Sequence, residues 1–178
     1  MATYELELSK TDFLNMSKKI NQLSQKLIQS KSLILKSLAE YTKERIQYYI
    51  KDTVGKTGYI PTNELLDSIM ISDIVGNTIR VFTDCAYAKF VEYGTGVTGS
   101  SNPHPKSAEI NWQYDKNAHG EKGWVYTIDN GSGEKQKFWT KGLEPHAFMY
   151  NAFRDLQQNY LTVARQILVE GGLLDWLY

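Results

Sequence analysis

The sequence predicts an α+β fold, in which a long N-terminal helix and a C-terminal helix pack on a small, mainly antiparallel sheet that carries an inserted aromatic β-hairpin loop. Both ends of the chain have apolar residues at helical spacing, whereas the middle alternates polar and apolar residues around Gly/Asn turns. A length of 178 residues suits one domain with its own core. We therefore expect a single domain over residues 1–178, with helices at about 10–52 and 145–170 and the sheet with its insertion at about 70–142.

The first helix has a single apolar stripe. Its large apolar residues recur at steps of three, four or seven, which places them on one face: Phe13, Met16, Ile20, Leu23, Leu27, Ile34, Leu38 and Tyr41. The simpler interpretation is an amphipathic core helix. Globular helices average about 11–12 residues, however, so this length also suggests an element that projects and packs against neighbouring subunits.

Charge is divided unevenly along the chain. Lys plus Arg equals Asp plus Glu, at 20 each, and this neutrality weakens the case for a dedicated nucleic-acid binder. Residues 10–56 nevertheless hold ten basic residues against four acidic ones, which is a net charge of +6 and leaves −6 for the rest. A solvated basic face explains this most simply. The alternative is a basic surface, with Lys18, Lys19 and Lys26, that meets an acidic neighbour or DNA in a channel.

Two strands joined by a tight turn are expected next. Met70–Val75 and Thr78–Thr83 alternate around Gly76-Asn77, a two-residue turn typical of hairpins. A short helical turn through Ile69 precedes them. Residues 87–93 then form either a short helix or a strand.

The insertion at 94–142 is rich in aromatic residues. Trp112–Tyr114 and Gly123–Ile128 are expected to pair as strands, and Lys137–Thr140 to return as a third. The hairpin is either core or interface, because Trp and Tyr are common in both, and the sequence leaves this choice open. The candidate interface residues here are Trp112, Trp124, Tyr126 and Trp139.

The second long helix is expected from Pro145, which is tolerated in a first helical turn, to Glu170. Gly171-Gly172 would end it. The segment after it is strongly apolar and is expected either to fold back on the core or to dock on a partner. Its candidate interface residues are Leu173, Leu174, Trp176 and Tyr178.

No catalytic constellation emerges from the motifs. Gly94-Thr95-Gly96 lacks the Gly-Lys-Ser/Thr of a phosphate loop. Glu92 is the best isolated carboxylate, and we expect it to cap or hydrogen-bond the glycine turn behind it. His146 lies at a helix start, where the positive end of the dipole disfavours protonation, so packing or capping is its simpler role.

Metal and membrane sites are not expected either. The single cysteine, Cys85, excludes an intramolecular disulfide and fits a reducing cytoplasm. The cysteine and the three histidines show no metal-ligand spacing, and no apolar run approaches the roughly 20 residues of a membrane helix. We therefore expect no catalytic residue, no metal, no cofactor and no membrane partner.

Two segments carry a resemblance. Residues 87–96 read Y-A-K-F-V-E-Y-G-T-G, and residues 142–148 read G-L-E-P-H-A-F. Together with Thr57-Gly58 and Leu65–Ile69, they resemble the neck, head-tail connector and tail-completion proteins of tailed bacteriophages, similar to the minor tail protein Z-like group. Pro145-His146-Ala147-Phe148 departs from the adjacent Pro-Phe of that family, and the insertion is longer than in its pattern. The family motif and loop anchor comprise Tyr87, Ala88, Val91, Glu92, Tyr93, Gly94, Thr95, Gly96, Pro145 and Phe148.

The resemblance implies a structural virion protein without enzymatic activity. It implies a ring of six copies, or twelve, that joins or completes the head-tail connection around the DNA channel, after assembly in the host bacterial cytoplasm. Its partners would be connector or head-completion proteins, the tail terminator or tail-tube proteins, and genomic DNA passing without sequence-specific binding. The alternatives are a tail terminator that caps the tube, a phage nuclease or hydrolase using Glu92 and a histidine, and a DNA-binding packaging accessory.

Overall fold

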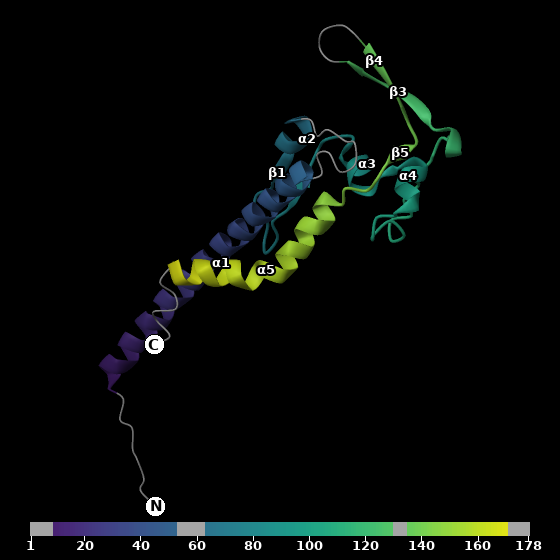
Figure 1. Ribbon diagram of the computed structural model, residues 1–178. Coiled ribbons are helices and arrows are strands. Elements are labelled where there is room, and N and C mark those ends of the chain that lie inside the picture. The colour runs from purple at the N-terminus through teal and green to yellow at the C-terminus, as the bar shows by residue number, and fades with distance from the viewer. Residues whose placement is uncertain (1–8, 53–62, 130–134, 171–178) are drawn as a thin grey trace, which may run out of the picture.

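The computed structural model describes residues 9–52, 63–129 and 135–170. The fold is α+β, with a long N-terminal helix, a C-terminal helix and antiparallel strands, as predicted, and the strands form two separate two-stranded sheets (Figure 1). The Thr57-Gly58 motif and the predicted apolar residues Leu173, Leu174, Trp176 and Tyr178 lie outside the described residues. The elements in order are α1 (Lys10–Asp52), α2 (Asn63–Asp67), β1 (Ile69–Ile71), β2 (Val81–Thr83), α3 (Ala88–Tyr93), α4 (Gly96–Ser101), the 3-10 helix η1 (Gly120–Lys122), β3 (Trp124–Asp129), β4 (Lys135–Thr140), β5 (Gly142–Leu143) and α5 (Phe148–Glu170).

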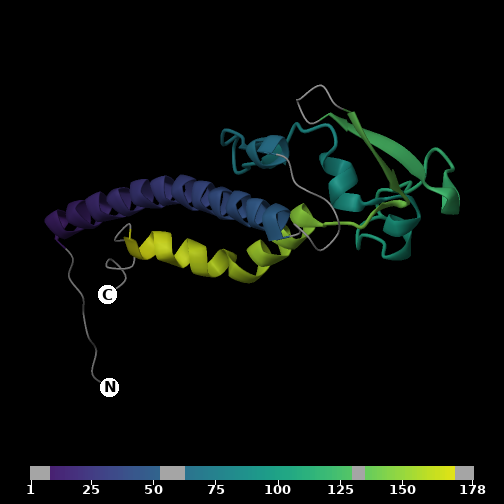
Figure 2. The same ribbon diagram turned by 45° about the horizontal axis from the view of Figure 1, so that its top comes forward.

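Helices α1 and α5 lie side by side (Figures 1 and 2). Asp155 on α5 joins them, because its Oδ2 atom lies 2.5 Å from Arg45 Nε and accepts a hydrogen bond of 3.0 Å from the Tyr49 hydroxyl. At about 1.5 Å per residue, α5 is about 35 Å long and α1 about 65 Å. The shorter helix therefore leaves the start of α1 projecting (Figure 2).

The projecting start of α1 corrects one interpretation of its apolar stripe. Every residue from 10 to 22 is exposed, and Phe13 and Ile20 each expose more than half of their surface. The core-helix interpretation is thus wrong for this part of the stripe, because α5 does not reach it. The second half of α1 contributes to the core, whose buried residues are Ile46, Ile50, Leu65, Ile69, Ala88, Val91, Phe148 and Ala152.

The predicted first hairpin is present, with shorter strands. β1 and β2 pair antiparallel, with Ile69 opposite Thr83 and Ile71 opposite Val81. Gly76, at φ 63°, begins the two-residue turn, as the Gly-Asn pair predicted. Residues 88–93 form the helix α3, which was one of the two expectations for that segment.

In the second half of the chain, two elements differ from expectation and one was not predicted. β3 pairs with β4, whereas 112–114 is no strand and contacts α3 instead. The glycine-rich segment from 96 to 101 forms the helix α4. Helix α5 begins at Phe148 and not at Pro145, because the residues between them bond to the end of α3.

Candidate functional site

The two segments that carry the resemblance pack against each other. Thr95 and Gly96 form antiparallel bridges with Leu143 and Gly142, and the Leu143 amide donates to Thr95 Oγ1 at 3.1 Å. The contact depends on small residues: a Cβ atom on Gly142, which has φ 118°, would lie 1.9 Å from the Thr95 carbonyl oxygen. Likewise, a Cβ atom on Gly96, at φ 62°, would lie 2.2 Å from the Lys141 carbonyl oxygen. Glycine is therefore required at both positions by backbone conformation and by space.

The Glu92 carboxylate caps the start of α5. Its Oε2 accepts a hydrogen bond of 2.8 Å from the Met149 amide, and its Oε1 accepts one of 3.0 Å from the Tyr150 amide. The first amides of a helix lack partners within the helix and attract negative charge, so this position suits a carboxylate. The expectation that Glu92 bonds the glycine turn behind it is therefore wrong. A cap contributed from 57 residues earlier in the chain, like the one on Met149, gives no local sequence signal.

Backbone hydrogen bonds also join the end of α3 to the segment before α5. The His146 amide donates to the Val91 carbonyl at 2.9 Å, and the Ala147 amide donates to the Glu92 carbonyl at 3.1 Å. Ala147 reaches this position with φ 49°, a conformation that costs a non-glycine residue free energy. The carbonyls at the end of α3 thus accept hydrogen bonds from the two residues before α5. Because these two residues bond to α3, the helix begins at Phe148.

A histidine from the insertion completes the Glu92 cluster. His104 is 3% exposed, and its Nε2 lies 3.1 Å from Glu92 Oε1. Its Nδ1 accepts a hydrogen bond of 3.0 Å from the Lys106 amide, so the proton lies on Nε2 and the ring donates to the carboxylate. The rings of Tyr93 and Tyr150 lie 4.4 Å and 5.4 Å from it. Sequence analysis missed this role, and the only local signal is the position of His104 between two prolines.

His146 is also buried, at 4% exposure. Removal of its ring from water lowers its pKa to about 4, and the nearby charge of Glu92 opposes that shift only in part. The ring is therefore neutral at pH 7, as expected from the sequence, although burial is the cause. The burial of His146 agrees with the packing role predicted for it.

The hydrogen bonds of Glu92 argue against the alternative of an enzyme that uses Glu92 and a histidine. Glu92 is 6% exposed and accepts three hydrogen bonds, from Met149, Tyr150 and His104. An enzyme that used this carboxylate as an acid or base would have to break bonds that hold the start of α5. The arrangement is that of a structural joint between α3, α5 and the insertion.

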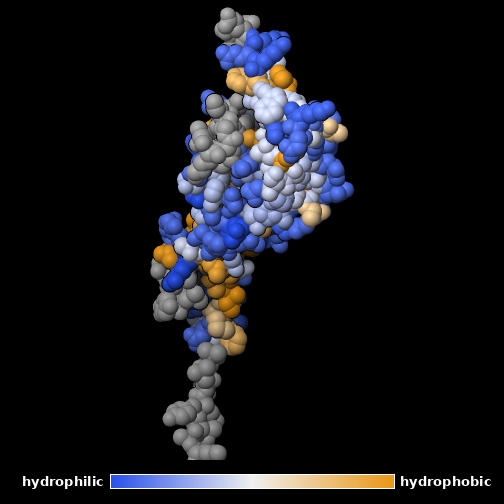
Figure 3. Space-filling model, turned by 45° about the vertical axis from the view of Figure 1, so that its right-hand side comes forward, coloured by the Kyte–Doolittle hydropathy of each residue, from blue (hydrophilic) through white to orange (hydrophobic). Residues whose placement is uncertain are grey.

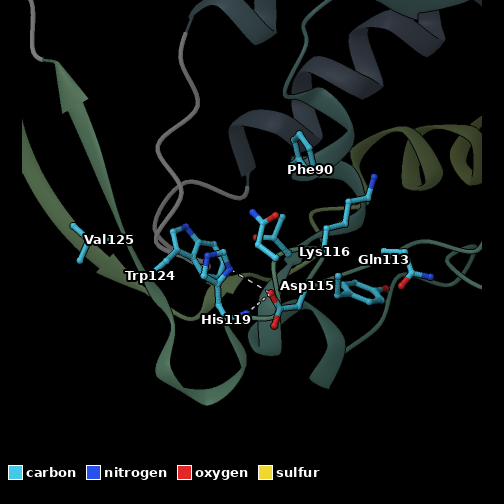
Figure 4. A pocket seen from close by; sticks show the side chains of 10 residues that line it. Phe90, Gln113, Asp115, Lys116, His119, Trp124 and Val125 are labelled. Carbon is cyan, nitrogen blue, oxygen red and sulfur yellow. Dashed lines mark hydrogen bonds and ion pairs between the residues drawn. The ribbon is translucent and has the colours of Figure 1, made fainter.

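A hollow of about 390 Å³ lies between α3 and the insertion (Figure 4). Asp115 at its wall accepts hydrogen bonds from the Gly120 amide at 2.7 Å and the His119 amide at 3.0 Å, and these bonds lower the pKa of its carboxyl. The His119 ring is tilted by 30° relative to Trp124, and the two ring centroids lie 4.8 Å apart. Asp115 and His119, at the wall of the hollow, therefore already make contacts within the insertion itself. The described residues contain no group of three His, Cys, Asp or Glu side chains placed to bind a metal ion.

The aromatic residues of the insertion that were predicted to form an interface fall into two groups. Trp112 and Trp124 are half-buried, and Trp112 Nε1 donates to the Gly94 carbonyl at 3.0 Å, so these two support the glycine turn and the loop. Tyr126 and Trp139, on the projecting β3–β4 hairpin, are 41% and 61% exposed.

The lysines proposed for an interface lie on the first half of α1. Lys18 and Lys19 are exposed, and Lys26 is half-buried. Of the family motif, Ala88, Val91, Glu92, Gly94, Gly96 and Phe148 are buried. The motif thus builds the inside of the joint, whereas Lys18 and Lys19 face outward.

Comparisons with known proteins add no family or relative. A scan against family models, a search of curated proteins and a search of solved structures each find no match. In the described part of the chain, no helix combines the length and the apolar character needed to cross a membrane.

Proposed function

We propose that this chain is a structural protein of the neck of a tailed bacteriophage virion, where its copies form a ring that joins or completes the head-tail connection. The resemblance in residues 87–96 and 142–148 motivates this proposal. The packing of these two segments into one joint supports it, because residues far apart in sequence then serve one structural purpose. The mechanism is binding alone, and no bond is broken.

One observation carries the assembly role. The first half of α1 exposes a set of large apolar side chains, each between 48% and 61% exposed: Phe13, Leu14, Met16, Ile20, Leu27 and Ile28. Hydrophobic side chains gather along the lower end of the molecule in Figure 3, where α1 extends below the rest. Monomers rarely expose contiguous apolar patches of this kind, so they mark a surface that another protein covers.

In a ring, the exposed apolar surface of α1 would contact a neighbouring copy. Closed rings form through head-to-tail contacts, in which two different surfaces of the same chain meet around the ring. By the resemblance, the ring has six copies, or twelve. It would stack between connector or head-completion proteins and the tail terminator or tail tube, and it would leave a channel for DNA.

The test is the mass of the purified protein in solution. Light scattering over a range of concentrations, alone and with the connector and tail-tube proteins of the same phage, should show a ring or a monomer that becomes one on its partner. A ring that binds only the finished end of the tail tube would indicate the tail terminator. A monomer that binds none of these proteins would refute the proposal.

A further inference from the structure

We infer that the projecting part of α1, residues 10–28, docks on the α2 and β1–β2 surface, residues 63–84, of a neighbouring copy. This inference rests on the proposed function, since it names the two surfaces that would meet in the ring. It follows from exposed apolar area, from the distribution of charge and from the position of the hairpin beside α1.

The projecting part of α1 is both apolar and basic. Its lysines at 10, 18, 19 and 26 stand against a single acid, Asp12, which gives a net charge of +3. Lys18 and Lys19 are exposed beside Ile20, itself 57% exposed. A partner must therefore offer apolar side chains to cover and an excess of carboxylates.

The surface at 63–84 has these properties. Its four acidic residues are exposed and stand against the single basic residue Arg80, for a net charge of −3: Glu64, Asp67, Asp73 and Asp84. No ion pair between described residues engages these four carboxylates. Val75 and Phe82 on the same hairpin are 77% and 41% exposed, so apolar area is available next to the charges.

The other described surfaces do not match the charge. Helix α5 carries two basic and two acidic residues, and the described residues of 94–143 carry six basic against four acidic. Two copies of the projecting part would bring like charges together, which disfavours a symmetric contact. Among the described residues, the surface at 63–84 is thus the acidic counterpart, and the contact is between different surfaces, as a ring requires.

The position of the hairpin within one copy leaves the projecting part open. Lys31 Nζ donates to Asn77 Oδ1, so the turn of the hairpin lies beside α1 at that residue. The projecting part begins on the N-terminal side of this contact and extends away from it (Figure 1). The hairpin of the same chain therefore does not cover residues 10–22, and a neighbouring hairpin has room to do so.

A charge-swap experiment tests the pairing. The variants are K18E/K19E, D67K/D73K and the two pairs combined, with K116E/K122E as a control that makes the same charge change on exposed lysines of the insertion. Assembly is followed by light scattering against protein concentration, at low and at high salt. We expect each pair alone to raise the concentration for half-assembly by about tenfold at low salt, the combination to restore most of the loss, and the control to match the wild type.

The outcomes separate this inference from the proposed function. If the wild type forms rings and both charge-reversed variants do so equally well, the inference is wrong and the ring stands. If K18E/K19E weakens assembly but the combination does not restore it, another protein or surface occupies the projecting part, and the inference is again wrong. Loss of duplex-DNA binding with unchanged assembly would assign the lysines to DNA. A wild type that forms no ring, either alone or with the connector and tail-tube proteins, refutes both.

Discussion

Replacement of Glu92 by Gln tests the joint between α3 and α5 most directly. The side chain keeps its shape, but one of the two carboxylate oxygens becomes an NH2 group, which donates and cannot accept. The Met149 and Tyr150 amides and His104 Nε2 all point at this carboxylate, from 2.8 to 3.1 Å, so at least one donor then faces another donor. The change also removes the negative charge at the start of α5.

The expected cost follows from these contacts. A hydrogen bond to a charged group contributes about 1.5–3 kcal/mol, and loss of a helix cap costs about 0.5–2 kcal/mol. These contributions overlap at one carboxylate, so we expect Glu92→Gln to lower the free energy of unfolding by about 2–4 kcal/mol. For a chain of 178 residues, that corresponds to a fall in Tm of about 5–15 °C.

Thermal unfolding measures the cost, and amide hydrogen exchange locates it. Glu109→Gln is the matched control, because it makes the same change in a side chain that is 63% exposed and pairs with Lys106, and it should shift Tm by less than about 2 °C. Exchange at the Met149 and Tyr150 amides should accelerate in Glu92→Gln more than exchange at the middle of α5. A Tm within about 2 °C of the wild type, or unchanged exchange at those two amides, would refute the capping role.

Three further predictions concern His146, Gly142 and Asp155. Because burial lowers the pKa of His146 to about 4, the unfolded chain binds a proton at a higher pH than the folded chain does. The free energy of unfolding therefore falls by about 2 kcal/mol as the pH drops from 6.5 towards 4. His146→Gln should flatten that part of the pH–stability curve in denaturant titrations. Gly142→Ala places a Cβ atom 1.9 Å from a carbonyl oxygen and should cost more than about 3 kcal/mol, whereas Gly120→Ala, with open space around it, should cost about 1 kcal/mol. Asp155→Asn loses its charge pair with the partly exposed Arg45 and should cost about 1 kcal/mol, less at high salt; equal loss at all salt concentrations would contradict an ionic contribution.

The sequence predicted the elements that rest on local patterns. The periodicity of α1 and the Gly76-Asn77 turn are local signals, and both the long helix and the first hairpin are confirmed. The start of α5 was placed three residues early because Pro145 is compatible with a first helical turn, whereas bonds to Val91 and Glu92 decide the boundary. Such bonds join residues far apart in the chain and leave no periodic signature.

The site was predicted less completely than the fold, for the same reason. The sequence singled out Glu92 and both glycine segments, but it assigned the carboxylate to the wrong partner and missed His104. Trp112 was placed in a strand because aromatic residues favour strands, whereas its ring packs on Phe90 at 5.7 Å and its Nε1 bonds to the Gly94 carbonyl. Tertiary contacts overrode local preference in each case.

The joint at Glu92 also relates the two halves of the molecule. The carboxylate holds α5, which holds α1 through Asp155, and it holds the insertion through His104. The Glu92 cluster therefore contributes, with the apolar core and the bridges at Thr95 and Gly96, to the direction of α1 relative to the β3–β4 hairpin. A ring needs every copy to present its surfaces at the same angle, since small angular errors accumulate around a closed circle. For the ring proposed above, rigidity at this joint would fix the angle between the projecting part of α1 and the β3–β4 hairpin, and the buried residues of the motif lie inside the joint.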